Sequence, residues 1–326
     1  MTYLIAFLLI ATTFAGCNAS AKNETDGNIR VLATTFPQYD WARQIIGERN
    51  DKVELTLLVD SGIDLHSFQP SVEDITKISN CDMFIYTGGI SDSWVADALD
   101  AGGNKDRIEI NLLEILGSEV KEEEEVEGMQ GEVEHEHSHE DAHGEHESDI
   151  DEHVWLSLKN AQRFTDHIAG KLGDLDVENA STYKNNATKY IEKLDELDSK
   201  FEDVVGNASK RTLLFGDRFP FRYLVDDYDL DYYAAFVGCS AETEASFETI
   251  VFLANKVDEL GLNYVMALET SNHSIAKTIV DNTKGKNQNI LVLDSIQSVS
   301  SDSISSDISY LSLMEENYEV IKKALE

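Results

Sequence analysis

Short apolar runs alternate with helix-like amphipathic stretches along most of the chain. In the first half, residues 30–35, 53–59 and 83–87 read as strands, and turn or loop residues bound each of them. The second half repeats this pattern at residues 212–215, 232–236, 264–268 and 290–293. Near-continuous apolar strands separated by helices are typical of parallel sheets that helices cover on both faces. The pattern therefore predicts an α/β fold with two lobes, each containing a mostly parallel sheet flanked by helices.

A long amphipathic pattern separates the two predicted lobes. Apolar residues recur there at alternating spacings of four and three, and no Gly or Pro interrupts residues 177–205. This spacing places the apolar residues on one face of a helix whose opposite face is charged. We expect one rigid helix (residues 173–206) to join an N-terminal lobe (residues 29–172) to a C-terminal lobe (residues 207–326).

The first residues have the pattern of a secretory signal. An apolar run at residues 4–11, too short to remain in a membrane as a spanning helix, is followed by Ala15-Gly16-Cys17 and a polar stretch. Cysteine directly after Ala-Gly resembles the lipobox of prokaryotic lipoproteins. We expect residues 1–17 to form a signal peptide with lipidation at Cys17, and residues 18–28 to form a flexible tether. The mature protein would then lie outside the cytoplasm, anchored to the cell membrane by its lipid.

The charge balance is strongly acidic. The chain has 62 Asp and Glu residues against 26 Lys and Arg residues, which gives a formal net charge of -36. Nucleic acid is excluded as a partner, because phosphate binding needs clustered Lys and Arg. An acidic surface attracts cations, but it is also an ordinary means of keeping a protein in solution. Charge alone therefore excludes one class of ligand and selects none.

One segment departs from the globular pattern. Residues 119–149 are rich in Asp and Glu, contain almost no large apolar side chain, and carry His135, His137, His139, His143 and His146. Such a segment cannot bury enough surface to fold alone, so we expect a disordered loop inserted in the N-terminal lobe. Imidazole and carboxylate groups bind divalent transition metals, and this composition predicts weak auxiliary binding. A solvated acidic spacer with incidental histidines is the alternative interpretation.

Candidate ligands also occur outside this segment. His66 lies in a turn-rich stretch after the predicted strand at 53–59, and His153 lies where globular sequence resumes after the acidic segment. Three carboxylates directly follow predicted strands of the second half: Asp217, Glu269 and Asp294. Because ligands bind at the carboxyl ends of strands in open α/β sheets, these groups are candidates for a shared cleft. Helix capping is the alternative role for an Asp in such a place.

Two of these stretches carry a resemblance to a known family. His66-Ser67-Phe68-Gln69-Pro70-Ser71 and Asp151-Glu152-His153-Val154-Trp155-Leu156 are similar to the first-lobe motifs of the zinc and manganese solute-binding proteins of ABC importers (cluster A-I). An acidic, histidine-rich insertion before the second motif is typical of the zinc-specific members. The resemblance covers residues 29–326. It implies an extracytoplasmic protein that captures zinc, with manganese as the alternative, and delivers it to a membrane permease and its ATPase.

The resemblance also implies a ligand set. His66 and His153 match the first-lobe ligands of the family, and Asp294 matches the carboxylate ligand of the second lobe. The remaining histidine of the family corresponds to Gly216, which has no side chain that can bind a metal.

Several residues are candidates for the place of this missing histidine. We expect Asp217 or Glu269 to take it, with His273 or a histidine of the acidic segment as alternatives. Two nitrogen and two oxygen ligands would move the metal preference toward manganese, whereas the histidine-rich segment favours zinc.

Two other functions stay open at this level. A secreted zinc hydrolase would use an open three-ligand site, and a cell-surface metal buffer or adhesin would depend on the histidine-rich segment. The chain contains no Gly-x-Ser-x-Gly elbow and no Gly-rich phosphate loop. We therefore expect a monomeric binding protein and not an enzyme. Whether Cys81 and Cys239 form a disulfide is left open, because sequence does not give the distance between them.

Overall fold

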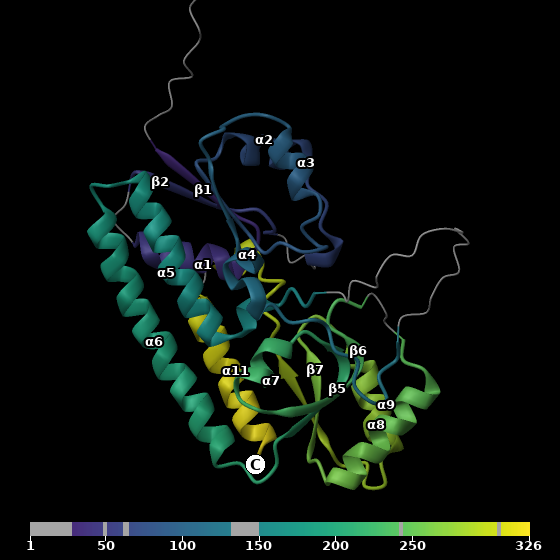
Figure 1. Ribbon diagram of the computed structural model, residues 1–326. Helices are drawn as coiled ribbons and strands as arrows, with labels where there is room; N and C mark the ends of the chain where they lie inside the picture. The colour runs from purple at the N-terminus through teal and green to yellow at the C-terminus, as the bar shows by residue number, and fades with distance from the viewer. Residues whose placement is uncertain (1–27, 48–50, 61–64, 132–149, 241–243, 305–307) are drawn as a thin grey trace, which may run out of the picture.

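The computed structural model describes residues 28–47, 51–60, 65–131, 150–240, 244–304 and 308–326. Within them lie two four-stranded parallel sheets, one in each lobe (Figure 1). The strand order in the first lobe is β2 (Val53–Leu57), β1 (Ile29–Ala33), β3 (Met83–Tyr86) and β4 (Ile108–Asn111). The order in the second lobe is β6 (Asp231–Val237), β5 (Thr212–Phe219), β7 (Tyr264–Leu268) and β8 (Asn289–Leu293). The predicted two-lobed α/β architecture is confirmed.

The strands differ from the sequence prediction at two places. β4 was missed because it is a short edge strand without an apolar run, and only Ile110 within it is buried. β5 continues beyond Phe215 to Phe219, with a register shift against β6 between Phe215 and Arg218. Gly216 and Asp217 therefore lie inside a strand, and not directly after one as the sequence predicted.

Helices cover both faces of the first sheet. They are α1 (Phe36–Ile46), α2 (Val72–Asn80), α3 (Val95–Asp100) and α4 (Leu112–Leu116). Because side chains alternate across a strand, Leu32 and Phe84 face α2 and α3, whereas Val31 and Ile85 join the large core that contains α1. The central strands β1 and β3 are thus apolar on both sides, which explains their near-continuous hydrophobic sequence.

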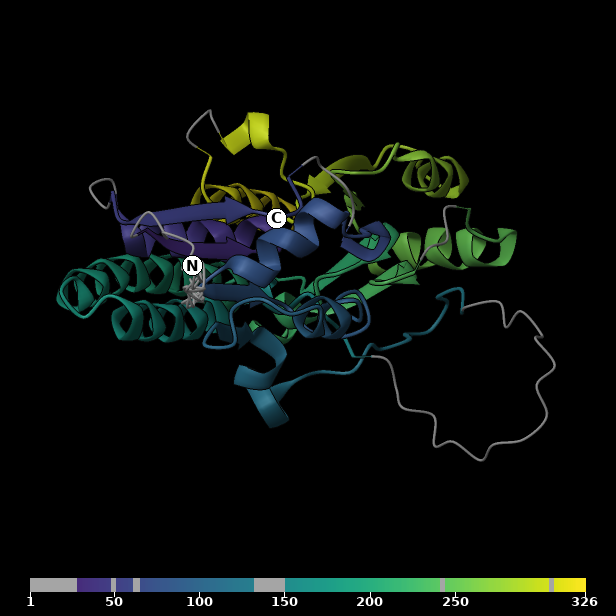
Figure 2. The ribbon, with the colours of Figure 1, turned by 90° about the horizontal axis from the view of Figure 1, so that it is seen from above.

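The second lobe follows the same plan. Its helices are α7 (Arg222–Asp227), α8 (Phe247–Leu260), α9 (Ser274–Asn282) and α10 (Ser301–Ile304). Leu214 and Val265 pack with α8 and α9, and Phe215 and Met266 point into the large core. Seen from above, α8 and α9 lie at the opposite side of the molecule from the teal helix pair α5 and α6 (Figure 2).

Three helices run between the lobes and hold them together. They are α5 (Leu158–Leu175), α6 (Ala180–Gly206) and α11 (Tyr310–Ala324). α6 packs against α5, α1 and α11 along its length (Figure 1). One continuous hydrophobic core includes these helices and residues of both sheets. No helix among the described residues has the length and apolar character that crossing a membrane requires.

The linking helix is shorter than predicted, and it packs against other helices. Residues 173–175 belong to the end of α5, and the chain turns at Asp176 before α6 begins at Ala180. The Asp176 carboxylate fixes this turn by accepting hydrogen bonds from Asn179 and from the Tyr183 hydroxyl, at 2.7 and 2.8 Å. The predicted helix began at residue 173, before this turn, because apolar periodicity alone does not show the turn.

The acidic segment predicted at residues 119–149 is ordered in its first part. Residues 119–131 are described, starting with the end of the 3-10 helix η2 (Gly117–Glu119), and they run along the second lobe. Val126 and Met129 pack against the large core, and the Gln130 backbone N–H donates to the Ala235 carbonyl at 3.0 Å. The expectation of disorder is wrong for these residues, because two apolar side chains and a backbone bond hold them. The five histidines of the segment lie outside the described residues.

We expect α6 to stabilise the molecule through its buried face. Replacing the fully buried Leu194 with Ala removes core contacts and should lower the free energy of unfolding by about 2–5 kcal/mol. Replacing the neighbouring exposed Lys193 with Ala should change it by less than about 0.5 kcal/mol. Urea denaturation of the metal-free protein, followed by circular dichroism, measures both. Equal effects of the two substitutions would contradict the packing described for α6.

Candidate metal site

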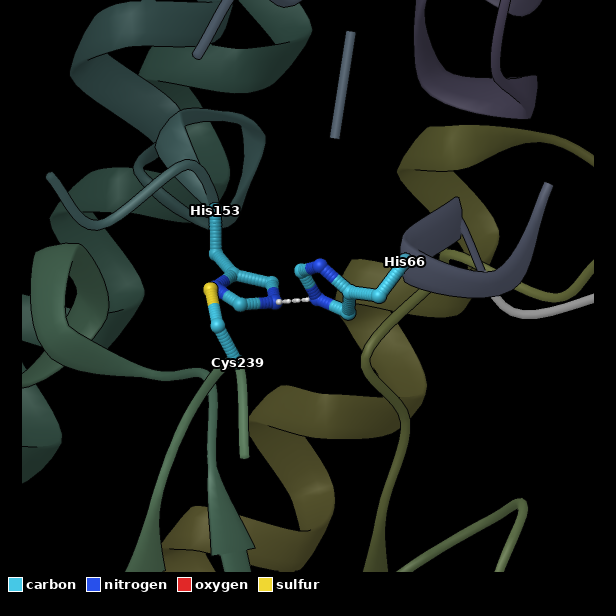
Figure 3. A group of neighbouring side chains, drawn as sticks. All are labelled: His66, His153 and Cys239. Atoms are coloured by element: carbon cyan, nitrogen blue, oxygen red, sulfur yellow. Dashed lines mark hydrogen bonds between the residues drawn. The ribbon is translucent and has the colours of Figure 1, made fainter. Parts of the chain in front are cut away.

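Two short 3-10 helices position the predicted histidine ligands. His66 lies within η1 (Leu65–Ser67), and His153 directly precedes η3 (Val154–Leu156). His153 is fully buried, and the His66 side chain is 15% exposed. Their Nε2 atoms face each other at 3.4 Å (Figure 3). The tertiary structure therefore brings the two predicted histidines together from distant parts of the sequence.

The second nitrogen of each imidazole is held by a neighbouring oxygen. His153 Nδ1 lies 3.0 Å from Asp151 Oδ1, which also accepts the His153 backbone N–H at 2.8 Å. His66 Nδ1 lies 2.6 Å from Ser91 Oγ. When the Nδ1 atoms donate these bonds, the lone pairs of both Nε2 atoms point into the space between the rings. Metal-binding histidines use their second nitrogen in this manner.

Cys239 completes a group of three potential ligands. It follows β6 in the second lobe, and its Sγ and one nitrogen of each histidine lie within 4.8 Å of one another (Figure 3). Among the described residues, this is the group whose donor atoms come close enough to hold one metal ion. The group therefore draws on both lobes, with the histidines from the first and the cysteine from the second.

The cysteines do not pair with each other. Cys81 and Cys239 are both free thiols. Cys81 is buried in the first lobe, where its thiol donates to the Ile78 carbonyl and burial raises its pKa to about 12. The disulfide left open by the sequence is absent, and Cys81 acts as a small apolar core residue.

Gly216 has no room for a side chain. A Cβ at this position would lie 2.5 Å from Ala276 Cα and 2.8 Å from Ala276 N, in the backbone of α9. Backbone atoms of a packed helix cannot move aside cheaply, so glycine is required here by close approach. The place of the family histidine is closed in this chain.

Asp217 is engaged in backbone hydrogen bonds. Its Oδ2 accepts from the Leu268 N–H at 3.1 Å and its Oδ1 from the Arg218 N–H at 3.0 Å. These bonds tie β5 to the end of β7. Asp217 is not a member of the group formed by His66, His153 and Cys239.

Glu269 and Asp294 lie at the ends of β7 and β8, as the sequence predicted, but outside that three-residue group. The Glu269 carboxylate accepts from the Ser295 N–H and hydroxyl at 3.0 and 2.6 Å. Asp294 Oδ1 accepts from the Ile296 N–H at 2.7 Å. Burial and the charge of Asp294 raise the pKa of Glu269 to about 7, and burial also raises the pKa of Asp294. As metal ligands, both carboxylates stay predictions.

The remaining alternatives lie elsewhere. His273 caps the start of α9 with a positive φ of 59°, and its Nε2 lies 3.2 Å from the Leu268 carbonyl. His135, His137, His139, His143, His146 and the expected lipidation site Cys17 lie outside the described residues.

Negative charge surrounds the two histidines. Asp151 and Glu152 are each 2% exposed, and Glu123 lies against Cys239, whose backbone N–H donates to it at 2.8 Å. Burial raises the pKa values of Glu152 and Glu123. Burial also opposes protonation of His153, but the charge and hydrogen bond of Asp151 outweigh it and raise the pKa of His153 above 6.5. The groups around His66 and His153 therefore favour a positive charge between or beside the two imidazoles.

Cys239 is a ligand candidate that was not predicted from the sequence, where it was considered only as a possible disulfide partner. A usable signal was present: Cys239 comes directly after the strand at 232–236 and Gly238. That is the same edge of the sheet at which ligands were expected. Glu123 gave no such signal, because it lies in a segment that was predicted to be disordered.

Comparison with known families shows where the chain belongs. Residues 31–324 match the family described as "ZnuA: Zinc-uptake complex component A periplasmic". The chain belongs to this family. The resemblance drawn from the two histidine motifs is confirmed.

Individual relatives are about a quarter identical to the chain over the aligned residues. Zinc-binding lipoprotein AdcA of Streptococcus pneumoniae is 26% identical over 320 residues, which cover 98% of this chain and 60% of AdcA. The chain thus spans less than two thirds of that relative. High-affinity zinc uptake system protein ZnuA of Bacillus subtilis is 26% identical over 323 residues, covering 98% of this chain and 94% of ZnuA.

A solved structure shares the fold. The metal-dependent lipoprotein YcdH of Bacillus subtilis superposes with a TM-score of 0.72 at 23% identity, with 91% of this chain and 99% of that chain covered. At this identity, the likeness shows a common two-lobed fold.

The closed position at Gly216 gives a direct prediction. Replacing Gly216 with Ala should destabilise the protein by about 1–3 kcal/mol, because the added methyl group overlaps the backbone of α9. Gly206 is the matched control, since a Cβ there meets no atom within 4 Å, and its replacement with Ala should be neutral or stabilising. Thermal unfolding of the metal-free variants measures the difference. Tolerance of Gly216→Ala equal to that of Gly206→Ala would mean that position 216 can accept a side chain.

Proposed function

We propose that this protein captures a divalent metal ion outside the cytoplasm, with zinc as its main cargo, and delivers it to an ABC permease for import. His66 and His153 bind the ion, and the protein acts as a carrier without catalysing a reaction. The observation that carries this proposal is the pair of imidazoles, the buried His153 and the partly exposed His66, whose Nε2 atoms face each other at 3.4 Å. Family membership over residues 31–324 and the names of the relatives as zinc-binding or zinc-uptake proteins support it.

The spacing of the two imidazoles matches that of zinc ligands. Two nitrogen atoms bound to one tetrahedral zinc at 2.0–2.1 Å lie about 3.3 Å apart. Neutral imidazole suits zinc, and manganese, the alternative cargo, prefers oxygen ligands. Asp294 stays a predicted further ligand from the second lobe.

The end of β8 lies beside the histidine loop, which supports a role for Asp294. The Trp155 indole N–H donates to the Ser295 carbonyl at 2.9 Å, and both residues are fully buried. This bond joins the residue next to Asp294 to the 3-10 helix that follows His153.

Delivery requires that the protein stay close to its permease. In this proposal Cys17 carries a lipid after the signal peptide is removed, and residues 18–28 tether the folded part to the membrane surface. The packing of α6 against α1, α5 and α11 restricts the lobes to small relative motions. Metal release is then a local change at the ligands and not a wide opening of the two lobes.

We expect His66→Ala to abolish tight zinc binding. Loss of a direct ligand should weaken zinc by more than about 100-fold, beyond the range seen when an outer-sphere partner is lost. Zinc at 100 times its Kd should stabilise the unaltered protein by about 2.7 kcal/mol, and the variant should lack this effect. Calorimetric titration and thermal unfolding measure the two quantities. His167→Ala, on the outer part of α5, is the control and should bind zinc normally. Unchanged affinity in His66→Ala would overturn the proposed site.

Replacing all five histidines of the acidic segment with Ser should leave one tight zinc site intact. These residues are His135, His137, His139, His143 and His146. Only weak additional binding should disappear, because the tight site uses ordered residues. Equilibrium dialysis against increasing zinc concentrations counts both classes of site. Complete loss of binding would support the metal-buffer function instead.

A further inference from the structure

We propose that Cys239 is a metal ligand, and that its thiolate binds the cargo ion together with His66 and His153 and selects zinc over manganese. This inference rests on the proposed function, because it concerns the same ion. Cys239 takes over the role of the family histidine whose position is Gly216 in this chain.

The three donor atoms are close to the geometry of one zinc ion. With Zn–N distances of 2.0–2.1 Å and a Zn–S distance of 2.3 Å, tetrahedral coordination places sulfur about 3.6 Å from each nitrogen. The donor atoms of His66, His153 and Cys239 lie within 4.8 Å of one another, and the two nitrogens are 3.4 Å apart. A shift of about an ångström or less by one side chain brings all three to ligand distance.

Two glycines explain why the ligand is at position 239 and not at position 216. At Gly216 a side chain would run into the backbone of α9, with Ala276 Cα at 2.5 Å. At Gly238 a Cβ would lie 3.1 Å from His153 Cε1 and 2.9 Å from the Phe219 carbonyl. The chain at Gly238 therefore passes directly against the imidazole of His153, which places the next residue, Cys239, beside the ring (Figure 3).

The backbone of Cys239 is fixed by the first lobe. Its N–H donates to Glu123 Oε1 at 2.8 Å, and Glu123 belongs to the ordered segment that runs from η2 along the second lobe. A positioned thiol loses little additional freedom on binding a metal ion, which favours tight coordination.

A buried oxygen without a hydrogen bond points to a cation at the same place. Glu152 Oε2 is buried and accepts no hydrogen bond within the described part of the chain, although Oε1 accepts the Ser91 N–H at 2.9 Å. It lies 3.8 Å from His66 Nδ1. A buried carboxylate is costly unless positive charge is near. A divalent ion between the histidines and Cys239 supplies that charge.

The chemistry of sulfur determines which ion this set prefers. Coordination replaces the S–H bond of Cys239 with a sulfur–metal bond and releases the proton to solvent. Thiolate is a soft ligand that favours zinc, whereas manganese favours carboxylate, carbonyl and water oxygens. Two imidazoles and a thiolate therefore form a site for zinc that discriminates against manganese.

The experiment uses the soluble protein from Ala19 onward, loaded with Co²⁺ as a spectroscopic probe and titrated with Zn²⁺ in competition with Mn²⁺. The unaltered protein should show sulfur-to-cobalt charge-transfer absorption in the near ultraviolet. Cys239→Ser should lose this absorption and bind zinc at least about tenfold more weakly, with a much smaller effect on manganese. Cys81→Ala is the matched control, because Cys81 is the other cysteine of the protein from Ala19 onward and lies in the core of the first lobe. It should retain both the absorption and the metal preference.

The possible outcomes separate this inference from the proposed function. Tight zinc binding that depends on His66, without charge-transfer absorption in the Co²⁺ protein, would overturn ligation by Cys239 and leave the carrier function standing. An unchanged ratio of zinc affinity to manganese affinity in Cys239→Ser would overturn the role of the thiolate in selectivity. Absence of any tight site in the unaltered protein would overturn both.

Discussion

The structure depends on the burial of one short segment, residues 151–156, at the junction of the two lobes. Every side chain in this segment is buried, although it includes Asp, Glu and His. Two of its backbone carbonyls have partners from distant elements: the Tyr223 hydroxyl donates to the Asp151 carbonyl, and the Tyr310 hydroxyl donates to the Trp155 carbonyl at 2.6 Å. Because an unpaired buried polar group costs free energy, these bonds fix the position of His153 as firmly as the core packing around it.

The metal site follows from this constraint. Because the position of His153 is fixed, a ligand from the second lobe has to lie close to it. The backbone around His153 determines which residues can do so. The close contact of Gly216 with α9 leaves no room for a ligand side chain at position 216. The contact of Gly238 with the His153 ring places the next residue, Cys239, beside that ring. The resemblance places a family histidine at position 216. In this chain, Cys239 at the end of the neighbouring strand β6 can take the role of that histidine. In the proposed site, this change of ligand position alters the donor atom and with it the metal that the site would prefer.

Around this site, packing buries carboxylates, and burial disfavours their negative charge. Burial raises the pKa values of Glu152, Glu123 and Asp294, which means that the folded protein holds carboxylates in surroundings that disfavour their charge. A divalent cation offsets this cost, so binding of the cargo also stabilises the fold. Some of the acidic residues therefore act locally, by favouring a cation at this site, and the net charge of the chain does not show this.

The sequence by itself determined the two-lobed α/β architecture, because strands buried on both faces and amphipathic helices leave period and composition signals that are local in the chain. It also indicated His66 and His153, since their motifs are contiguous. Only the tertiary structure decided that residues 119–131 are ordered, that Asp217 lies inside β5, and that Cys239 lies beside the histidines. These features depend on contacts between residues far apart in sequence, in which a few ångströms of backbone approach decide what fits. Hydrophobic periodicity describes which face of an element is buried, but it does not contain the distance from that element to its neighbour.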